Sequence, residues 1–372
     1  MKTIYTPNQI LATAALLVAT ICLPIVTTSQ TYVAKASGDW SNPKIWGEQH
    51  PDSNLCEKTV IIPKGKWVNL DKEIDLDERV ELVVKGKLKS EERVLDLSNI
   101  QLIGDGKILA SEIHADETTV YGFEGLVYVD KAKFFDGDYS IPSTFVVEDE
   151  LILMNALVDL NQGKLKLKKR SKLMMGSSEI DTTEGKLIAG NHIKLYYIGD
   201  GGFAGPEATL RGVESINISL DDENASIVLA NNQELKADVV INVGELDING
   251  FALTTYNDLV CAENGYIRGD QNSDLLVGGN SNLVFADNKG VLNTFKVGAK
   301  ETEVEIHSPL LVTDLADLSY GKLDMNKNVM TVAGQLYKSD FVKIKGKDSK
   351  WVKVVEELPV EDFLSGAVAT TQ

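Results

Sequence analysis

A short glycine-led motif recurs along the chain and constrains its fold more than any other feature. The motif is a glycine, usually one further residue, and then Leu, Ile or Val. It occurs at Gly86, Gly106, Gly125, Gly163, Gly185, Gly212, Gly244, Gly265, Gly290 and Gly321. If the longest interval counts as two steps, the average step is about 23.5 residues. A period of this size is typical of solenoids, whereas a β-sandwich would not keep the same glycine at each turn.

The segments between these glycines have the pattern of short β-strands. Stretches such as 80–84, 216–220 and 239–243 alternate or cluster apolar residues and are bounded by Gly, Asn and Asp. We therefore predict an all-β protein, a single-stranded right-handed parallel β-helix with capped ends and the glycines at its corners. Coils stacked at about 4.8 Å would give ten to twelve turns and a rod about 50–55 Å long.

Two copies of the motif are almost identical, GELDIN at 244–249 and GKLDMN at 321–326. They lie about three coils apart, so Asp247 and Asp324 are expected about 14 Å from each other if the copies stack. Glycoside cleavage uses two carboxylates about 5–9.5 Å apart, so these two do not form such a pair.

The first residues have the pattern of an export signal. An apolar run without charge spans 10–26 and is followed by small polar residues that suit cleavage near Ser29. We predict a signal peptide at 1–29, a cap at 30–57, the β-helix at 58–340 and a C-terminal cap or tail at 341–372. An uncleaved N-terminal anchor is the alternative. The mature chain would then be secreted or on the cell surface, without a membrane span.

Charge and cysteine content exclude several partners. The chain has 37 basic and 55 acidic residues, a formal net charge of −18, which does not suit nucleic acid or an anionic membrane as partner. After signal removal only Cys56 and Cys261 remain, too few for a disulfide framework or a cysteine metal site. No cofactor is expected.

Several segments resemble exported β-helix surface proteins of the Bacteroidetes type. At the N-terminal end these are WSNPKIW (40–46), VIIPKG (60–65) and VNLD (68–71), which are also similar to the start of G8-type domains. Further along, GYIRG (265–269), SDLLVGG (273–279) and the segment up to residue 334 are similar to the repeat of the same proteins. The resemblance implies a right-handed parallel β-helix that works outside the cell as an adhesin or structural surface protein. No sorting or anchoring module is recognisable after residue 340.

Aromatic residues at the two ends are candidates for caps. An open solenoid end exposes its core and an unpaired strand edge. Trp40, Trp46 and Pro51 are expected to plug the first coil, and 341–364 the last.

Few residues are candidates for chemistry, and no catalytic residue is assigned. Asp136, Asp138 and Tyr139 combine carboxylates with an aromatic ring, as sugar sites do. The basic run KLKLKKRSK at 164–172 is read as one strand whose cationic face either touches acidic glycans or is simply solvated.

One acidic loop is the only candidate metal site. Asp221, Asp222 and Glu223 could bind Ca²⁺ through oxygen ligands, or they form a solvated loop tip. The four histidines are scattered and lack the short spacing of metal ligands.

These features favour a secreted or surface-displayed structural protein that acts by adhesion or extracellular assembly. Its partners would be an extracellular surface, a glycan or like subunits. The alternatives are a carbohydrate-active enzyme, either a polysaccharide lyase or a hydrolase, and a self-assembling filament subunit. Convergent carboxylates or a carboxylate–arginine pair in a groove would favour the enzyme.

Overall fold

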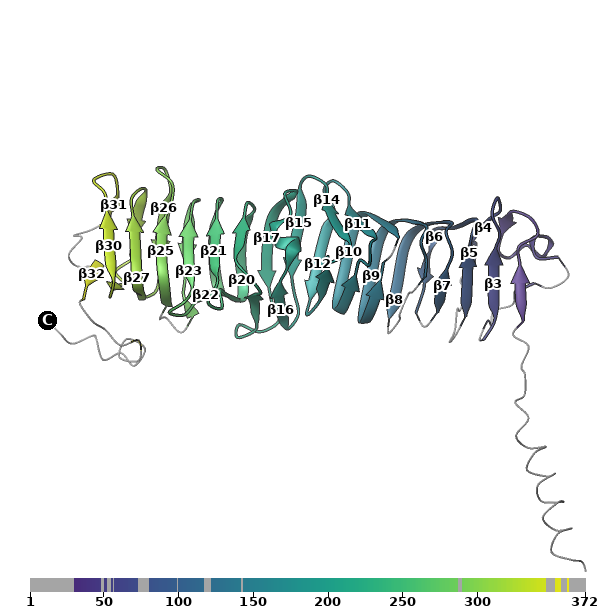
Figure 1. Ribbon diagram of the computed structural model, residues 1–372, viewed down its shortest axis with the longest axis horizontal. Coiled ribbons are helices and arrows are strands. Elements are labelled where there is room, and N and C mark those ends of the chain that lie inside the picture. Colours follow the sequence, from purple (N-terminus) through teal and green to yellow (C-terminus); the bar gives the residue numbers. More distant parts are fainter. Residues whose placement is uncertain are drawn as a thin grey trace, which may run out of the picture.

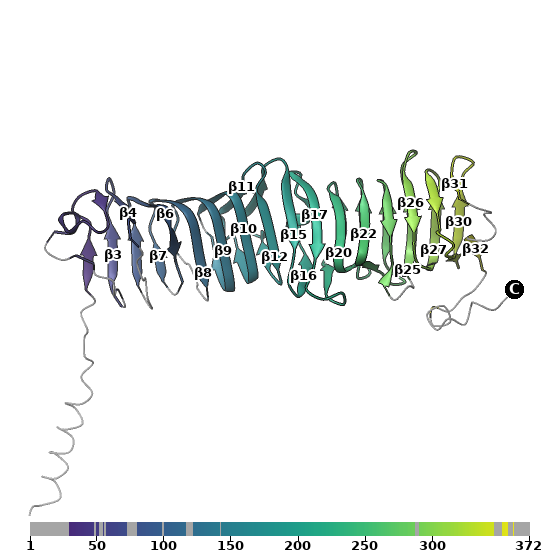
Figure 2. The same ribbon diagram turned by 180° about the vertical axis from the view of Figure 1, so that it is seen from behind.

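The computed structural model is a long, straight β-solenoid (Figures 1 and 2). It describes residues 30–47, 50–51, 55, 57–72, 80–98, 100–116, 122–141, 143–286, 290–345, 352–355 and 360. The chain is 60% strand, and its parallel sheets wind through about 14 turns. The prediction of an all-β parallel β-helix is therefore confirmed. The predicted signal peptide, at 1–29, lies outside the described residues.

Each coil has up to three sides, which we call faces 1, 2 and 3 in the order in which the chain passes them. Face 1 begins with β2 and β4 and continues through the first parts of four long strands to β11 and β14. After a break it continues through β19, β21, β23, the second parts of β25 and β27, and β30. The bounds are β2 (Gly38–Asp39), β4 (Trp67–Asn69), β6 (Lys87–Asp96), β8 (Lys107–Asp116), β9 (Leu126–Ser140), β10 (Thr144–Asp159), β11 (Lys164–Leu167), β14 (Lys186–Ala189), β19 (Gln233–Leu235), β21 (Ala252–Thr255), β23 (Asp274–Val277), β25 (Gly290–Val297), β27 (Leu310–Leu318) and β30 (Gln335–Lys338).

Face 2 is one unbroken parallel sheet from β6 to β31. It is built from the later parts of β6, β8, β9 and β10, then from β12, β15 and β17, and from the first parts of β20 and β22. Pairing continues through β24, β26 and β28 to β31. The bounds are β12 (Lys172–Gly176), β15 (Ile193–Tyr197), β17 (Val213–Ser219), β20 (Asp238–Asp247), β22 (Leu259–Arg268), β24 (Ser281–Leu283), β26 (Glu303–Ile306), β28 (Lys322–Asp324) and β31 (Lys343–Ile344).

Face 3 closes each coil. It holds the ends of β9, β10, β20 and β22, the first parts of β25 and β27, and nine short strands. These are β1 (Thr31–Val33), β3 (Thr59–Ile62), β5 (Glu81–Val84), β7 (Gln101–Ile103), β13 (Glu179–Asp181), β16 (Gly201–Ala204), β18 (Ser226–Leu229), β29 (Met330–Val332) and β32 (Val352–Val354). Two 3₁₀ helices occur in the described residues: η1 (Pro43–Ile45), near the N-terminal end, and η2 (Pro206–Thr209), which occupies the face 1 position of its coil.

Inward side chains of successive coils stack directly on one another. On face 1, Leu88, Ile108, Val127, Phe145 and Leu165 follow one another in register, and all five are buried. Because the strands are parallel and in register, each coil buries its apolar side chains against the coils on both sides. The result is one continuous core along the rod.

The coils are shorter than the glycine spacing predicts. Register partners on face 1, from Trp67 through Lys87, Lys107, Leu126, Thr144 and Lys164 to Lys186, are 18 to 22 residues apart. This is why the rod has about 14 turns rather than ten to twelve. At the strand spacing, its length is about 65 Å.

The glycines of the motif do lie at turns, but not at one common corner. Gly86, Gly106, Gly125, Gly163 and Gly185 precede face 1 strands, Gly212 and Gly321 precede face 2 strands, and Gly244 and Gly265 lie between the face 2 and face 3 parts of β20 and β22. Gly290 begins β25 on face 3.

Close approach of backbones explains most of these glycines. A Cβ on Gly163 would lie 1.8 Å from the carbonyl oxygen of Ile141, and one on Gly106 would lie 2.3 Å from that of Gly86. Within the motif set only Gly244 and Gly321 have a positive φ, at 97° and 84°. Stacking of the coils thus excludes a side chain at these turns whatever the dihedral angles.

The two near-identical hexapeptides at 244–249 and 321–326 do not stack on the same face of the rod, so the expectation of stacked copies is wrong. Asp247 is the register partner of Arg268 on face 3, and Asp324 is the partner of Glu305 on face 2. What they share is a local turn: the aspartate accepts a hydrogen bond from the backbone N–H two residues on, at 2.8 and 3.0 Å. The same turn occurs at Asp96, Asp159, Asp181, Asp222 and Asp270.

The N-terminal coil contains the two tryptophans predicted for the cap. Trp40 is 1% exposed, and its ring meets that of Trp46 edge-on at 4.8 Å. The Trp46 indole donates to the carbonyl oxygen of Trp40 at 2.9 Å, and Pro51 is also buried.

At the C-terminal end, β31 and β32 pair with the last full coil. Phe341, predicted to close this end, is instead 66% exposed, while the neighbouring Val342 is buried. Trp351 and 361–364 of the predicted C-terminal cap lie outside the described residues.

Candidate functional site: a cationic corner

The basic run at 164–172 forms a sharp corner between faces 1 and 2. Its first half is β11 and its end begins β12, so the prediction of one continuous strand is wrong. The chain turns at 168–171, where Arg170 has a φ of 69° and the Ser171 hydroxyl donates to the carbonyl oxygen of Lys168 at 2.9 Å. The turn places cations on two faces and on the edge between them.

The next coil adds further cations beside the first. Lys186 is the register partner of Lys164, and Lys194 is the partner of Lys172. Between them, the Arg170 N–H donates to the carbonyl oxygen of Asn191, next to His192, at 3.0 Å. We call this set the cationic corner: Lys164, Lys166, Lys168, Lys169, Arg170, Lys172, Lys186, His192 and Lys194.

Like charges in direct register cost stability. Strands pair at about 4.8 Å, and equal charges placed opposite each other on a sheet repel. Two such lysine pairs on neighbouring faces therefore concentrate positive potential on a chain whose net charge is −18. A bound anion would offset this repulsion.

A surface groove lies on the face 2 side of the cationic corner. It has a volume of about 400 Å³ and is lined by Arg170, Lys172, His192, Lys194 and Glu214. The His192 Nδ1 atom lies 3.3 Å from Glu214 Oε1, and both side chains are about half exposed. The groove thus offers several cations and one carboxylate that already has a partner.

Acidic residues border the cationic corner toward the N-terminal end of the rod. Glu148, Asp149 and Glu150 form the equivalent corner of the preceding coil, and Lys172 Nζ lies 3.5 Å from Glu150 Oε1. Burial, helped by Asp149 and Glu148, raises the pKa of Asp130 one coil further on. The hydrogen bond from the Tyr128 hydroxyl to Glu148 raises the pKa of Tyr128. The potential therefore changes sign sharply along the rod.

A second polar cluster lies on face 2 and is internally satisfied. Glu112 Oε1 lies 2.7 Å from both Lys133 Nζ and His114 Nε2. The hydrogen bonds from Lys133 and then from His114 lower the pKa of Glu112. One carboxylate held by a lysine and a histidine leaves little capacity for a ligand.

The structure separates the aromatic candidate for a sugar site, Tyr139, from the two carboxylates. Tyr139 is 2% exposed, stacks on Phe134 at 4.8 Å, and donates its hydroxyl to the carbonyl oxygens of Ala115 and Phe135. Asp136 and Asp138 are exposed, but Asp136 accepts from the Asn155 side chain at 2.9 Å, which supports the bend of β9. A buried ring cannot stack on a sugar that these carboxylates contact.

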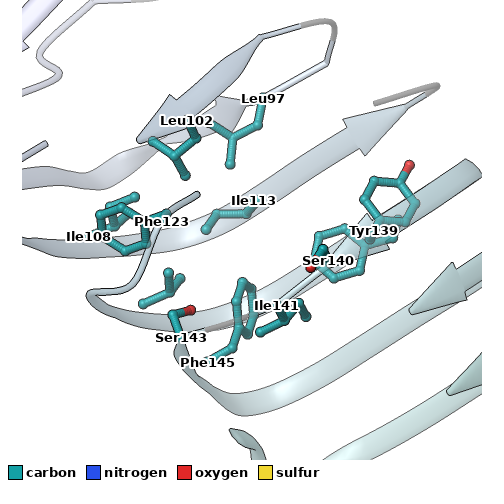
Figure 3. Close-up of a pocket in the computed structure, with 12 residues that line it drawn as sticks. Leu97, Leu102, Ile108, Ile113, Phe123, Tyr139, Ser140, Ile141, Ser143 and Phe145 are labelled. Atoms are coloured by element: carbon teal, nitrogen blue, oxygen red, sulfur yellow. The ribbon is translucent and has the colours of Figure 1, made fainter. Parts of the chain in front are cut away.

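Tyr139 instead lines a small cavity in the core (Figure 3). The cavity has a volume of about 30 Å³, and aromatic and aliphatic side chains surround it together with the buried Ser140 and Ser143. A space of this size holds no more than a water molecule or two. It is a packing defect between coils.

The acidic loop at 221–223 is organised by a local turn. Asp222 Oδ1 accepts from the backbone and side-chain nitrogens of Asn224, which lowers the pKa of Asp222. In the described residues, no group of three His, Cys, Asp or Glu is placed to hold a metal ion. Cys261 is buried, which raises its pKa to about 12, and Cys56 lies outside the described residues.

One polar group in the interior was missed by sequence reasoning. Glu207 on η2 is 1% exposed, and its Oε1 accepts from the Tyr197 hydroxyl at 2.7 Å and from the Gly205 N–H at 2.8 Å. Its Oε2 is buried without a hydrogen-bond partner. Burial raises the pKa of Glu207 above 4.5 and that of Tyr197 well above 10. This pair lies inside the rod.

The fold and the groove together define a parallel β-solenoid with a cationic surface site. No family model, curated protein or solved structure matches the chain. In the part of the chain that the structure describes, no helix is long and apolar enough to span a bilayer.

Proposed function

We propose that this is a secreted or surface-displayed structural protein that adheres to anionic glycans through its cationic corner. One observation carries the proposal: eight lysine and arginine side chains and a histidine gather in two neighbouring coils of a chain with a net charge of −18. The N-terminal sequence pattern and the resemblance to exported surface proteins support the extracellular location.

The chemistry of the site suits carboxylated or sulfated sugars. Lysine is a flexible point charge that follows irregularly spaced anions, whereas paired arginines favour planar bidentate contacts. Lys164, Lys166, Lys172, Lys186 and Lys194 stand on a ladder of paired strands, so the spacing of their Cα atoms is set before a ligand arrives. Exposed ion pairs are each weak and screened by salt, so adhesion would depend on several contacts at once.

Calorimetric titration with polygalacturonate tests the proposal, with neutral dextran as the comparison polymer. We expect polygalacturonate to bind at low salt, binding to weaken as salt is raised, and dextran not to bind. The double variant Lys172→Gln/Lys194→Gln should weaken binding about four- to 25-fold, from two exposed contacts of up to about 1 kcal/mol each. Lys236→Gln, at the same corner three coils further on, is the matched control. Absence of polygalacturonate binding, or equal loss in the control, would contradict the proposal.

A polysaccharide lyase is the second candidate, because one observation favours it. The groove places the His192–Glu214 pair beside Arg170 and two lysines, and a lyase needs a base near a cation that neutralises a uronate. Incubation with polygalacturonate would reveal cleavage by the ultraviolet absorbance of the new double bond. Binding without product supports adhesion. A hydrolase is not favoured, since only one carboxylate lines the groove.

A further inference from the structure

The cations of the corner are ordered along the coil. Lys164, Lys166, Lys168, Arg170 and Lys172 occur at every second residue, and all are at least partly exposed. Within β11 every second residue points to the same side, at about 6.6 Å intervals. The turn at 168–171 then carries Lys168 and Arg170 around the corner to Lys172 at the start of β12, so the row passes from face 1 to face 2 over a path shorter than that of an extended strand.

The row of cations is not repeated along the rod. Toward the N-terminal end, the next coil presents Glu148, Asp149 and Glu150 at the equivalent corner. Toward the C-terminal end, the exposed Arg211 lies at the equivalent corner, but Glu214 lines the groove and Ser215 is the register partner of Lys194. The two lysine rows are therefore only about 5 Å apart, and a single arginine follows them.

We infer that the ligand is a linear polyanionic glycan that lies across the rod and follows the coil from Lys164 to Lys172. This inference rests on the proposed function and adds the shape and direction of its ligand. A chain laid parallel to the rod axis would meet one pair of stacked cations and then the carboxylates of the preceding coil. A chain laid across the rod meets five cations in succession, with a second row of Lys186, His192 and Lys194 beside it.

The carboxylates of Glu148, Asp149 and Glu150 favour the transverse direction of the glycan over the axial one. The hydrogen bond from the Tyr128 hydroxyl holds Glu148 in place, and Lys168 Nζ lies 6.0 Å from the centroid of the same ring. Fixed like charges beside a binding row repel an anionic ligand that leaves it. The boundary thus aligns a polymer with the coil.

Lysines placed on the two alternative paths provide the test. Lys164 and Lys172 are at opposite ends of the transverse path. Lys131 is on face 2, in register with Glu150 and so two coils from Lys172 along the axial path. The three single variants Lys164→Gln, Lys172→Gln and Lys131→Gln would be titrated with a galacturonate dodecamer and dimer, and with a sulfated glycan of similar length. Lys236→Gln again serves as the matched control, and circular dichroism would check that each variant is folded.

For the transverse path we expect Lys164→Gln and Lys172→Gln each to weaken dodecamer binding about two- to fivefold. Lys131→Gln and the control should leave it unchanged, and the dimer should bind much more weakly because it cannot reach both ends. The titration with the sulfated glycan tells whether the site prefers carboxylate or sulfate. If the variants lose affinity in the same pattern for both polymers, both polymers follow the transverse path.

Two outcomes would overturn the inference while leaving the proposed function intact. Loss of affinity in Lys131→Gln with none in Lys164→Gln would mean that the polymer runs along the rod. A dimer that binds as tightly as the dodecamer would mean a compact site. Failure of polygalacturonate and of both oligomers to bind would count against the proposed function itself.

Discussion

Replacing Gly163 with alanine tests the stacking of coils most directly. The turn holding Gly163 precedes β11, and the backbone of the preceding coil passes directly beside its Cα atom. A Cβ there would lie 1.8 Å from the carbonyl oxygen of Ile141 and 2.6 Å from that of Ser143. Ordinary van der Waals contact begins at about 3.4 Å, so the backbones must separate by more than about 1 Å.

The cost can be estimated from the hydrogen bonds that join these coils. The Lys164 N–H donates to the carbonyl oxygen of Ser143, on the preceding coil, at 2.8 Å, and the Lys186 N–H of the following coil donates to that of Gly163 at 3.0 Å. A separation of about 1 Å from the preceding coil takes the first bond beyond the usual 3.2 Å limit. Each bond contributes about 1 kcal/mol net, and a buried group left unpaired costs about 1–3 kcal/mol. We expect Gly163→Ala to lower the free energy of unfolding by about 3 kcal/mol.

Gly298→Ala is the matched control, because Gly298 also lies at a corner but has room for a side chain. Its nearest neighbour to an added Cβ is the Leu276 Cδ2 atom at 3.3 Å, and its φ is not positive. The change should be within about 0.5 kcal/mol of the natural protein, since alanine also restricts the unfolded chain.

Urea denaturation followed by circular dichroism would give the free energy of unfolding of both variants. Solenoids can open locally, so amide hydrogen exchange at Lys164 and Lys186 should be measured as well. Equal stability and equal exchange in the two variants would refute the explanation of the motif by close backbone approach.

Three further changes have expected outcomes. Burial raises the pKa of Glu207 above its ordinary value of 4.5, so the folded state binds this proton more tightly than the unfolded state, and the free energy of unfolding should fall as pH rises from about 4.5 through the raised pKa. Glu207→Gln should remove this fall in denaturation curves recorded across that pH range, and an unchanged pH profile in the variant would contradict the explanation. Asp247→Ala removes the acceptor of the Asn249 N–H and should lower the free energy of unfolding in urea by about 0.5–1.5 kcal/mol. Asp247→Asn keeps an acceptor and should lower it clearly less, and equal losses in the two variants would contradict the role of this turn. Deleting residues 31–57 uncovers the first full coil and should cause aggregation detectable by light scattering, and a monomeric truncation with the same Tm would show that this segment is not a cap.

The sequence contained enough to predict the solenoid but not the length of its coil. Glycine is required wherever the backbones of neighbouring coils come too close for a side chain, and such contacts recur from coil to coil. They occur at more than one corner, however, so the interval between two glycines is not always one turn. From Gly185 to Gly212 the chain completes one coil and then a further face, which is why the interval is longer than the register step of 22 residues between Lys164 and Lys186.

The first row of the cationic corner was visible in the sequence, and the second row, on the next coil, was not. KLKLKKRSK is recognisable by composition, but Lys186, His192 and Lys194 join it only through the register of the next coil. A 22-residue offset cannot be read without knowing the length of that coil.

The burial of Tyr139 has a local physical cause. Alternation counted from the buried Phe134 would place Asp136 inward and Tyr139 outward. Asp136 instead has a φ of 45°, and the bend between faces 2 and 3 reverses the alternation. Glu207 carried no signal of burial at all, since η2 replaces a strand that a regular coil would have at that place.

The break in face 1 makes the rod mechanically uneven. Face 2 is continuous through this region, but at η2 face 1 has no strand to pair with β14 or β19. The cationic corner lies immediately on the N-terminal side of this level. If a polymer bound there is pulled while the far end is held, strain would concentrate at this level, where face 1 lacks strand pairing. The coil with η2 would then flex first and act as a compliant joint between the cationic segment and the rest of the shaft.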